Sequence, residues 1–300
     1  MGTLRGFPDP PAMSSAQQSC ATLTHMAEAE LLTSKQVAAF VADGYLKFDA
    51  IVPPAICGAV LQELGAGGPP SSFGASPASP ARAWPGQPLA GRFQEWPALA
   101  SLVELPAVAA IVRSLLGPDP LYDHHYAHVI GPKQRWSQPW HADAILDPRR
   151  TAFDIQLFFF PHETPREMGG TMVLPGSHLR RVNEAAIARY QNFVGQTAMV
   201  CPAGSLLVCH HGIWHGGQPN LTDRPRTMFK LRLGPSGPQR RTWDTRDLDD
   251  AEIGRILSRD HRWYGHEVRL EIVNRIRLWR ALTDRPSFDV DHWLTRLENR

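Results

Sequence analysis

Histidine is concentrated in the middle of this chain of 300 residues. Nine of its 13 histidines lie between His124 and His215. Histidine is the commonest metal ligand among the side chains and the usual acid or base near pH 7. The middle third is therefore where we look first for chemistry.

The pair His141-x-Asp143 can hold two adjacent positions on a metal, because residues i and i+2 of a strand share a face. A third ligand must come from elsewhere in the chain. The stretch 210–217 supplies three candidates, which are His210, His211 and His215. Two histidines and one carboxylate on one face of iron, with the other face open, are typical of non-haem Fe(II) oxygenases. The spacing alone leaves the choice among the three histidines open.

Arg226 follows His215 by eleven residues, at the start of an apolar run. A co-substrate with a distal carboxylate, such as 2-oxoglutarate, needs a fixed bidentate cation deep in its site. Period-two alternation places Met228, Lys230 and Arg232 on the same face as Arg226. We expect Lys230 and Arg232 to reach solvent near the far end of the strand, and the alternative is that one of them binds an anionic substrate group.

The elements that position these residues are short strands. Apolar or alternating runs separated by Gly/Pro turns cover residues 121–130, 151–160, 171–174, 197–200, 205–209 and 227–233. Many short strands with such turns predict a sandwich or a barrel. The fold class is therefore mainly β with flanking helices.

Helices are predicted on both sides of this region. Thr33 and Gln36 form a capping box before an apolar stripe, and Gly44 stands where that helix ends. An apolar helical pattern covers residues 106–116, and a third begins near residue 249.

The domain organisation follows from composition. We expect a disordered tail over residues 1–28 and a β-rich domain with N-terminal helices over 29–245. A helical extension over 246–300 is expected to pack on that domain. A flexible loop is expected over 65–97, because residues 65–80 are Gly, Ala, Pro or Ser except for one Phe. That loop is either a disordered surface segment or a lid over the site.

Composition and missing motifs exclude several classes of protein. The formal net charge of +2 is too balanced to suggest a nucleic-acid binder. No run of about 18 apolar residues and no secretory leader is present, so we expect no membrane contact. Four cysteines without C-x-x-C spacing indicate reduced thiols in a cytoplasmic protein. The absence of G-x-G-x-x-G and of a P-loop motif excludes Rossmann and P-loop enzymes.

At this point the chain resembles a known family. His141-x-Asp143, His215 and Arg226 are similar to the pattern of the phytanoyl-CoA dioxygenase family of Fe(II)/2-oxoglutarate oxygenases, as are the stretches 214–220 (WHGGQPN) and 169–178 (GGTMVLPGSH). The resemblance covers about residues 31–233. It implies a double-stranded β-helix core, also called a jelly roll or cupin-like barrel.

The resemblance also implies the site. It selects His215 over His210 and His211, which are then expected to pack or support the site. Fe(II) would be bound by His141, Asp143 and His215, and Arg226 would pair with the far carboxylate of 2-oxoglutarate, with O2 as the second co-substrate.

The implied activity is hydroxylation of an unactivated C–H bond in a small molecule, such as a natural-product or acyl-type substrate, with release of succinate and CO2. The alternatives are a cupin-like metalloenzyme without 2-oxoglutarate, for example an isomerase, and a non-catalytic binding module on the same scaffold. We expect a monomer or a homodimer. One residue departs from the family's pattern: many members have Ser or Thr two residues after the distal histidine, whereas this chain has Gly217.

Overall fold

The protein is described from a computed structural model. The described residues are 30–65, 96–135, 137–144, 147–181 and 183–296. The predicted N-terminal tail and residues 66–95 of the predicted loop lie outside them.

Two antiparallel sheets form the centre of the molecule. The larger sheet has the strand order β1 (Tyr45–Phe48), β6 (Ser205–His210), β3 (Ile155–Phe160), β8 (Arg226–Gly234) and β2 (Leu121–Ile130). The smaller sheet has the order β5 (Thr197–Ala198), β4 (Thr171–Val173) and β7 (His215–Gly217). Sequence-distant strands lie side by side in both sheets, as in a jelly roll. The predicted fold class is confirmed.

Strands β3 and β6 are buried on both faces, which explains why most of their residues are apolar. In β3, Leu157 and Phe159 belong to the core shared with the helices, whereas Phe158 and Phe160 belong to the core between the sheets. Strand β3 begins at Ile155 rather than at residue 151 as predicted. Its partner β6 ends at His210, opposite Ile155, so the ladder between these two strands stops there.

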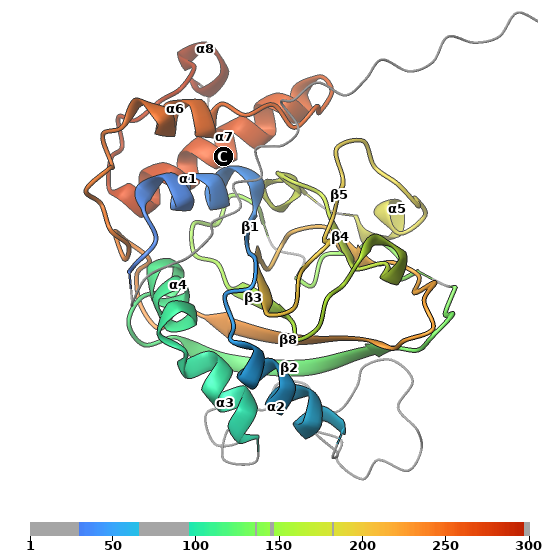
Figure 1. Ribbon diagram of the computed structural model, residues 1–300. Coiled ribbons are helices and arrows are strands. Elements are labelled where there is room, and N and C mark those ends of the chain that lie inside the picture. Colours follow the sequence, from blue (N-terminus) through green and yellow to red (C-terminus); the bar gives the residue numbers. More distant parts are fainter. Residues whose placement is uncertain (1–29, 66–95, 136, 145–146, 182, 297–300) are drawn as a thin grey trace, which may run out of the picture.

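Helices surround the sheets on the outside (Figure 1). They are α1 (Ser34–Asp43), α2 (Pro54–Gly65), α3 (Pro97–Glu104), α4 (Pro106–Leu116), α5 (Glu184–Ile187), α6 (Ala251–Leu257), α7 (His266–Thr283) and α8 (His292–Thr295), with short 3-10 turns at Arg166–Met168 and Ser177–Leu179. The predicted capping box is present at the start of α1, where the Thr33 side chain accepts a hydrogen bond from the Gln36 backbone N–H. Gly44 ends the helix in the left-handed conformation, with φ of 82°.

The helices after residue 246 pack on α1 (Figure 1). Asp247 accepts a hydrogen bond of 2.7 Å from the Ser34 backbone N–H. Asn274 on α7 donates one of 2.9 Å to the Leu179 carbonyl, at the end of the 3-10 turn that follows β4. Through these contacts the C-terminal segment packs against α1 and against the turn that follows β4.

Within the described part of the chain, no single helix is long and apolar enough to cross a membrane. Helices α3 and α4 reach that length only together, and they are bent by 63° against each other. Their apolar side chains are part of the core.

Candidate metal centre

His141 and His215 lie side by side on two neighbouring antiparallel segments. His215 opens β7, and His141 pairs with it in an isolated antiparallel bridge. The bridge consists of two backbone hydrogen bonds of 3.0 and 2.9 Å, one in each direction. The imidazole centroids are therefore only 4.3 Å apart. Asp143 does not continue a strand, contrary to the prediction, but lies in a bend just after the bridge.

Backbone carbonyls fix which nitrogen of each imidazole carries the proton. His141 Nδ1 lies 2.9 Å from the Pro139 carbonyl, and His215 Nδ1 lies 3.1 Å from the Ile213 carbonyl. A carbonyl can only accept, so each Nδ1 donates and each Nε2 presents a lone pair. The Gln138 side-chain amide donates to His141 Nε2 at 3.2 Å, which agrees with this assignment.

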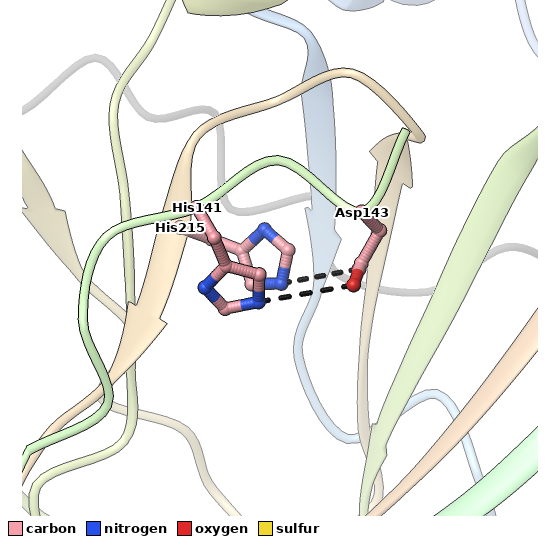
Figure 2. A group of neighbouring side chains, drawn as sticks. All are labelled: His141, Asp143 and His215. Carbon is pink, nitrogen blue, oxygen red and sulfur yellow. Dashed lines mark ion pairs between the residues drawn. The ribbon is translucent and has the colours of Figure 1, made fainter. Parts of the chain in front are cut away.

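The two Nε2 atoms point at the Asp143 carboxylate (Figure 2). His215 Nε2 is 3.3 Å from Oδ2, and His141 Nε2 is 3.7 Å from Oδ1. One ligand atom from each residue lies within 4.8 Å of the others. Two imidazole lone pairs and one carboxylate converging on one point are a donor set that suits iron.

The charge states of His141 and Asp143 also suit a metal, which needs deprotonated ligands. Burial, together with the neighbouring His215, lowers the pKa of His141 to about 4. Burial alone would raise the pKa of the Asp143 carboxyl, but His215 and Lys230 outweigh it and hold that pKa well below its usual range. At neutral pH, His141 is neutral and Asp143 is ionised.

A cavity of about 240 Å³ opens beside this cluster. Four apolar side chains line one part of it, namely Ile130, Phe158, Phe160 and Met228. Polar side chains line the rest, namely His128, Gln138, His141, Asp143, Thr171, His215, Gln218, Arg226 and Lys230. The cavity is large enough for a small co-substrate next to the cluster.

Arg226 lies in the cavity wall at the start of β8 and is 6% exposed. Its Nη1 donates to the carbonyls of Met168 and Gln218, both at 2.9 Å, and of Gly170 at 3.5 Å. Burial lowers its pKa to about 10, so the guanidinium stays charged at neutral pH. The carbonyls fix the side chain through one amino group, and Nη2 lies beside Gly217, 3.4 Å from where a Cβ would stand.

The hydroxyl that Gly217 lacks is present on the neighbouring strand. In the β4–β7 pairing, Thr171 stands directly opposite Gly217 and lines the cavity. Within the described part of the chain its Oγ1 donates to the Met228 sulfur, a weak acceptor, at 3.9 Å. Sequence reasoning quoted Thr171 within a motif but assigned it no role, because the strand pairing is not visible in the sequence.

Two further histidines of the middle third, His128 and His125, do not belong to the candidate metal cluster. His128 lines the cavity, and burial with the nearby Lys230 lowers its pKa to about 3. His125 lies on the opposite face of β2 and packs on Trp96 at 5.0 Å between ring centroids. Among the described residues, the only group of His, Cys, Asp and Glu side chains able to hold a metal is His141, Asp143 and His215.

His210 is the last residue of β6 and His211 follows it, and their rings stack with centroids 4.7 Å apart. His178 is buried against His210 and donates from Nε2 to the Val41 carbonyl at 3.2 Å. These three side chains join α1, β6 and the loop after β4, in agreement with the packing role expected for His210 and His211.

The expectation that Lys230 reaches solvent is wrong. Lys230 is 6% exposed, and its Nζ donates to Asp143 Oδ2 at 2.5 Å. Arg232, two residues on, pairs instead with Asp154 at 2.6 Å. The bend that carries Asp143 covers the inner face of β8 at Lys230, so this side chain does not reach solvent.

Comparison with known proteins gives a family and a set of similar folds. The family model described as phytanoyl-CoA dioxygenase matches residues 40–228. No curated protein sequence matches the chain significantly.

Three solved structures illustrate the similarity of fold. The alpha-ketoglutarate-dependent carbocyclase SnoK from nogalamycin biosynthesis has a TM-score of 0.55 and 21% identity, covering 77% of this chain and 94% of its own. EctD from S. alaskensis, solved with 2-oxoglutarate and 5-hydroxyectoine, has a TM-score of 0.53, 19% identity and coverage of 73% and 81%. The epimerase SnoN, in complex with Fe3+, alpha ketoglutarate and nogalamycin RO, has a TM-score of 0.52, 16% identity and coverage of 68% and 84%.

Proposed function

We propose, because this chain belongs to the phytanoyl-CoA dioxygenase family, that it is a non-haem Fe(II)/2-oxoglutarate-dependent oxygenase that hydroxylates an unactivated C–H bond of a small molecule. The observation that carries the proposal is the convergence of His141 Nε2, His215 Nε2 and the Asp143 carboxylate at one side of a cavity whose wall holds Arg226. The donor set, its charge state and the neighbouring cavity all fit this cofactor.

The two histidines and Asp143 would hold Fe(II) next to the cavity. When bound, the iron supplies O2 activation and the oxidising power for C–H cleavage. The balanced reaction converts substrate, O2 and 2-oxoglutarate into hydroxylated substrate, succinate and CO2. One oxygen atom of O2 enters succinate, and the other enters the substrate as the new hydroxyl group. The protein itself orients the reactants and keeps the ligands deprotonated.

Arg226 and Thr171 bind the distal carboxylate of 2-oxoglutarate. The guanidinium is held rigid by backbone carbonyls, so little side-chain entropy is lost on binding. Thr171 offers a hydroxyl from β4, opposite Gly217. This arrangement supplies the hydroxyl for which the family's pattern uses the residue two positions after the distal histidine.

Apolar walls keep water away from the reacting bond. Phe158 and Phe160 project from β3 between the sheets, and Met228 lies opposite them on β8. A dry cavity strengthens the Arg226–carboxylate pair and protects reactive species from side reactions.

The experiment that tests the proposal measures succinate formation from 2-oxoglutarate by the Fe(II)-loaded protein, with a panel of substrates and mass analysis of products. A gain of one oxygen supports hydroxylation, whereas loss of two hydrogens indicates ring closure or desaturation and an unchanged mass indicates epimerisation. Similar folds carry the last two kinds of chemistry under the names carbocyclase and epimerase.

Variants of the cluster sharpen this test. His141→Ala and Asp143→Gly should lose iron binding and turnover together. His211→Ala should keep both, because His211 stacks on His210 and does not line the cavity. A wild-type protein that binds iron without consuming 2-oxoglutarate would point to a cupin-like metalloenzyme, and one that binds no iron to a binding module.

A further inference from the structure

We infer that Lys230 binds an anionic group of the substrate, so that the enzyme acts on a carboxylate or a similarly charged small molecule. The inference rests on the proposed function, because it concerns the charge of the site once metal and 2-oxoglutarate are bound. It adds a substrate class, which neither the family nor the fold specifies.

The placement of Lys230 is unusual for a lysine. Its side chain is 6% exposed and reaches into the cavity from the middle of β8. Lysine is rarely buried unless it is paired, because an unpaired buried charge is costly. Among the described residues the carboxylate paired with it is Asp143, at 2.5 Å, and the Phe158 ring lies 5.8 Å from Nζ.

That carboxylate is also the proposed metal ligand. Once a divalent cation is bound, the negative charge of Asp143 is shared between the metal and Lys230. The ammonium then stands beside a second cation with only part of a counter-charge, and like charges at such distances repel.

A count of charges in the cavity leads to the same result. Among the described lining residues, the acidic and strongly basic side chains are Arg226, Lys230 and Asp143, and histidines bind a metal in their neutral form. A divalent metal and the dianion of 2-oxoglutarate cancel each other. One positive charge remains, in an enclosed site, and a substrate anion neutralises it.

Lys230 could instead serve only to orient Asp143. That role needs a hydrogen-bond donor but no charge, and a positive charge opposes metal binding. The two roles predict opposite effects on metal affinity when Lys230 is replaced by a neutral residue. Loss of an orienting partner weakens metal binding, typically by 10- to 100-fold, whereas loss of a repelling charge leaves it unchanged or makes it tighter.

The geometry also limits where oxidation occurs. Because Lys230 Nζ lies within hydrogen-bond distance of a metal-ligand carboxylate, an anion held by Lys230 lies close to the metal. The carbons nearest to that anionic group are then the ones beside the oxidising centre. We expect the new hydroxyl within a few bonds of the substrate's anionic group.

The test uses full-length protein, with Mn(II) in place of Fe(II) to prevent turnover. Calorimetry first gives the Kd values for Mn(II) and for 2-oxoglutarate. Acetate and the neutral, equally small acetamide are then titrated into the loaded protein. The variants are Lys230→Met, Lys230→Gln as a second neutral side chain, and Lys230→Arg, which keeps the charge. Arg232→Met on the same strand and face is the matched control, and thermal melting reports folding.

Acetate is expected to bind the wild type, Arg232→Met and Lys230→Arg in preference to acetamide. Both neutral variants at Lys230 should bind acetate roughly 10- to 150-fold more weakly, the value of one hydrogen bond to a charged group, with Mn(II) affinity unchanged or increased. Equal acetate affinity in wild type and neutral variants, no acetate binding by the loaded wild type, or a tenfold loss of Mn(II) affinity in the neutral variants would overturn the inference. A wild type that binds neither Mn(II) nor 2-oxoglutarate would instead overturn the proposed function.

Discussion

Replacing Arg226 by lysine is expected to reduce the affinity for 2-oxoglutarate strongly while leaving the fold intact. The structure explains why lysine is not an adequate substitute. Nη1 already donates to three carbonyls, those of Met168, Gly170 and Gln218, so the co-substrate must be bound by the rest of the guanidinium. A single ammonium can satisfy the carbonyls or the carboxylate, but not both.

The magnitude follows from the burial of this pair. Truncating one partner of a buried, hydrogen-bonded charge pair costs roughly 2–5 kcal/mol, which corresponds to about 30- to several-thousand-fold in Kd. Arg226→Met is a poorer test, because it leaves three carbonyls without a donor at about 1–3 kcal/mol each and so also lowers stability.

The assay compares two ligands by calorimetry on Mn(II)-loaded protein. 2-Oxopentanoate has the chain length of 2-oxoglutarate but ends in a methyl group. The wild type should prefer 2-oxoglutarate by the factor given above, and Arg226→Lys should lose most of that preference while binding 2-oxopentanoate as before. Arg232→Lys, paired with Asp154 outside the cavity, should behave as wild type. If Arg226→Lys keeps the wild-type preference within about threefold, the distal carboxylate of 2-oxoglutarate is bound by another residue and the role given to Arg226 is wrong.

Three further outcomes are expected. His215→Ala should abolish Mn(II) binding and His211→Ala should preserve it in the same calorimetric assay, and the reverse result would move the ligand to His211. Thr171→Val should weaken 2-oxoglutarate binding by about tenfold, the value of one hydrogen bond to a charged acceptor, and Gly217→Ser in that variant should restore it; a failure of the serine to restore affinity would remove Thr171 from the co-substrate site. Burial lowers the pKa of His178 from 6.5 to about 3, so between these pH values the unfolded chain binds the extra proton and the free energy of unfolding falls as pH falls, by about 1.4 kcal/mol per pH unit. Urea melts across this window should show a shallower dependence for His178→Gln, and an unaltered slope would mean that His178 is not buried in its neutral form.

Local sequence patterns predicted most of the scaffold because each of them has a local physical cause. The capping box of Thr33 and Gln36 and the left-handed Gly44 define α1 through contacts within one turn of the chain. The apolar runs that became β3 and β6 are buried on both faces, so their composition alone marks them as strands.

Elements that depend on distant partners were not predictable in the same way. Helix α3 follows a long Gly- and Pro-rich stretch and starts at Pro97, with no side-chain cap to mark it. Asp143 reaches the two imidazoles through a bend, because only His141 pairs with β7. The sequence predicted that the three residues meet, but the strand it invoked for the meeting is absent.

Lys230 shows most clearly where a periodic pattern stops being informative. Alternation along β8 correctly puts Arg226, Met228 and Lys230 on one face, and all three line the cavity. Alternation gives the direction of a side chain but not its depth, which depends on what covers that face. Here Asp143 covers it, from a bend 87 positions earlier in the chain. The burial of this ammonium, which the sequence could not reveal, is what makes the charge of the substrate a testable property of the site.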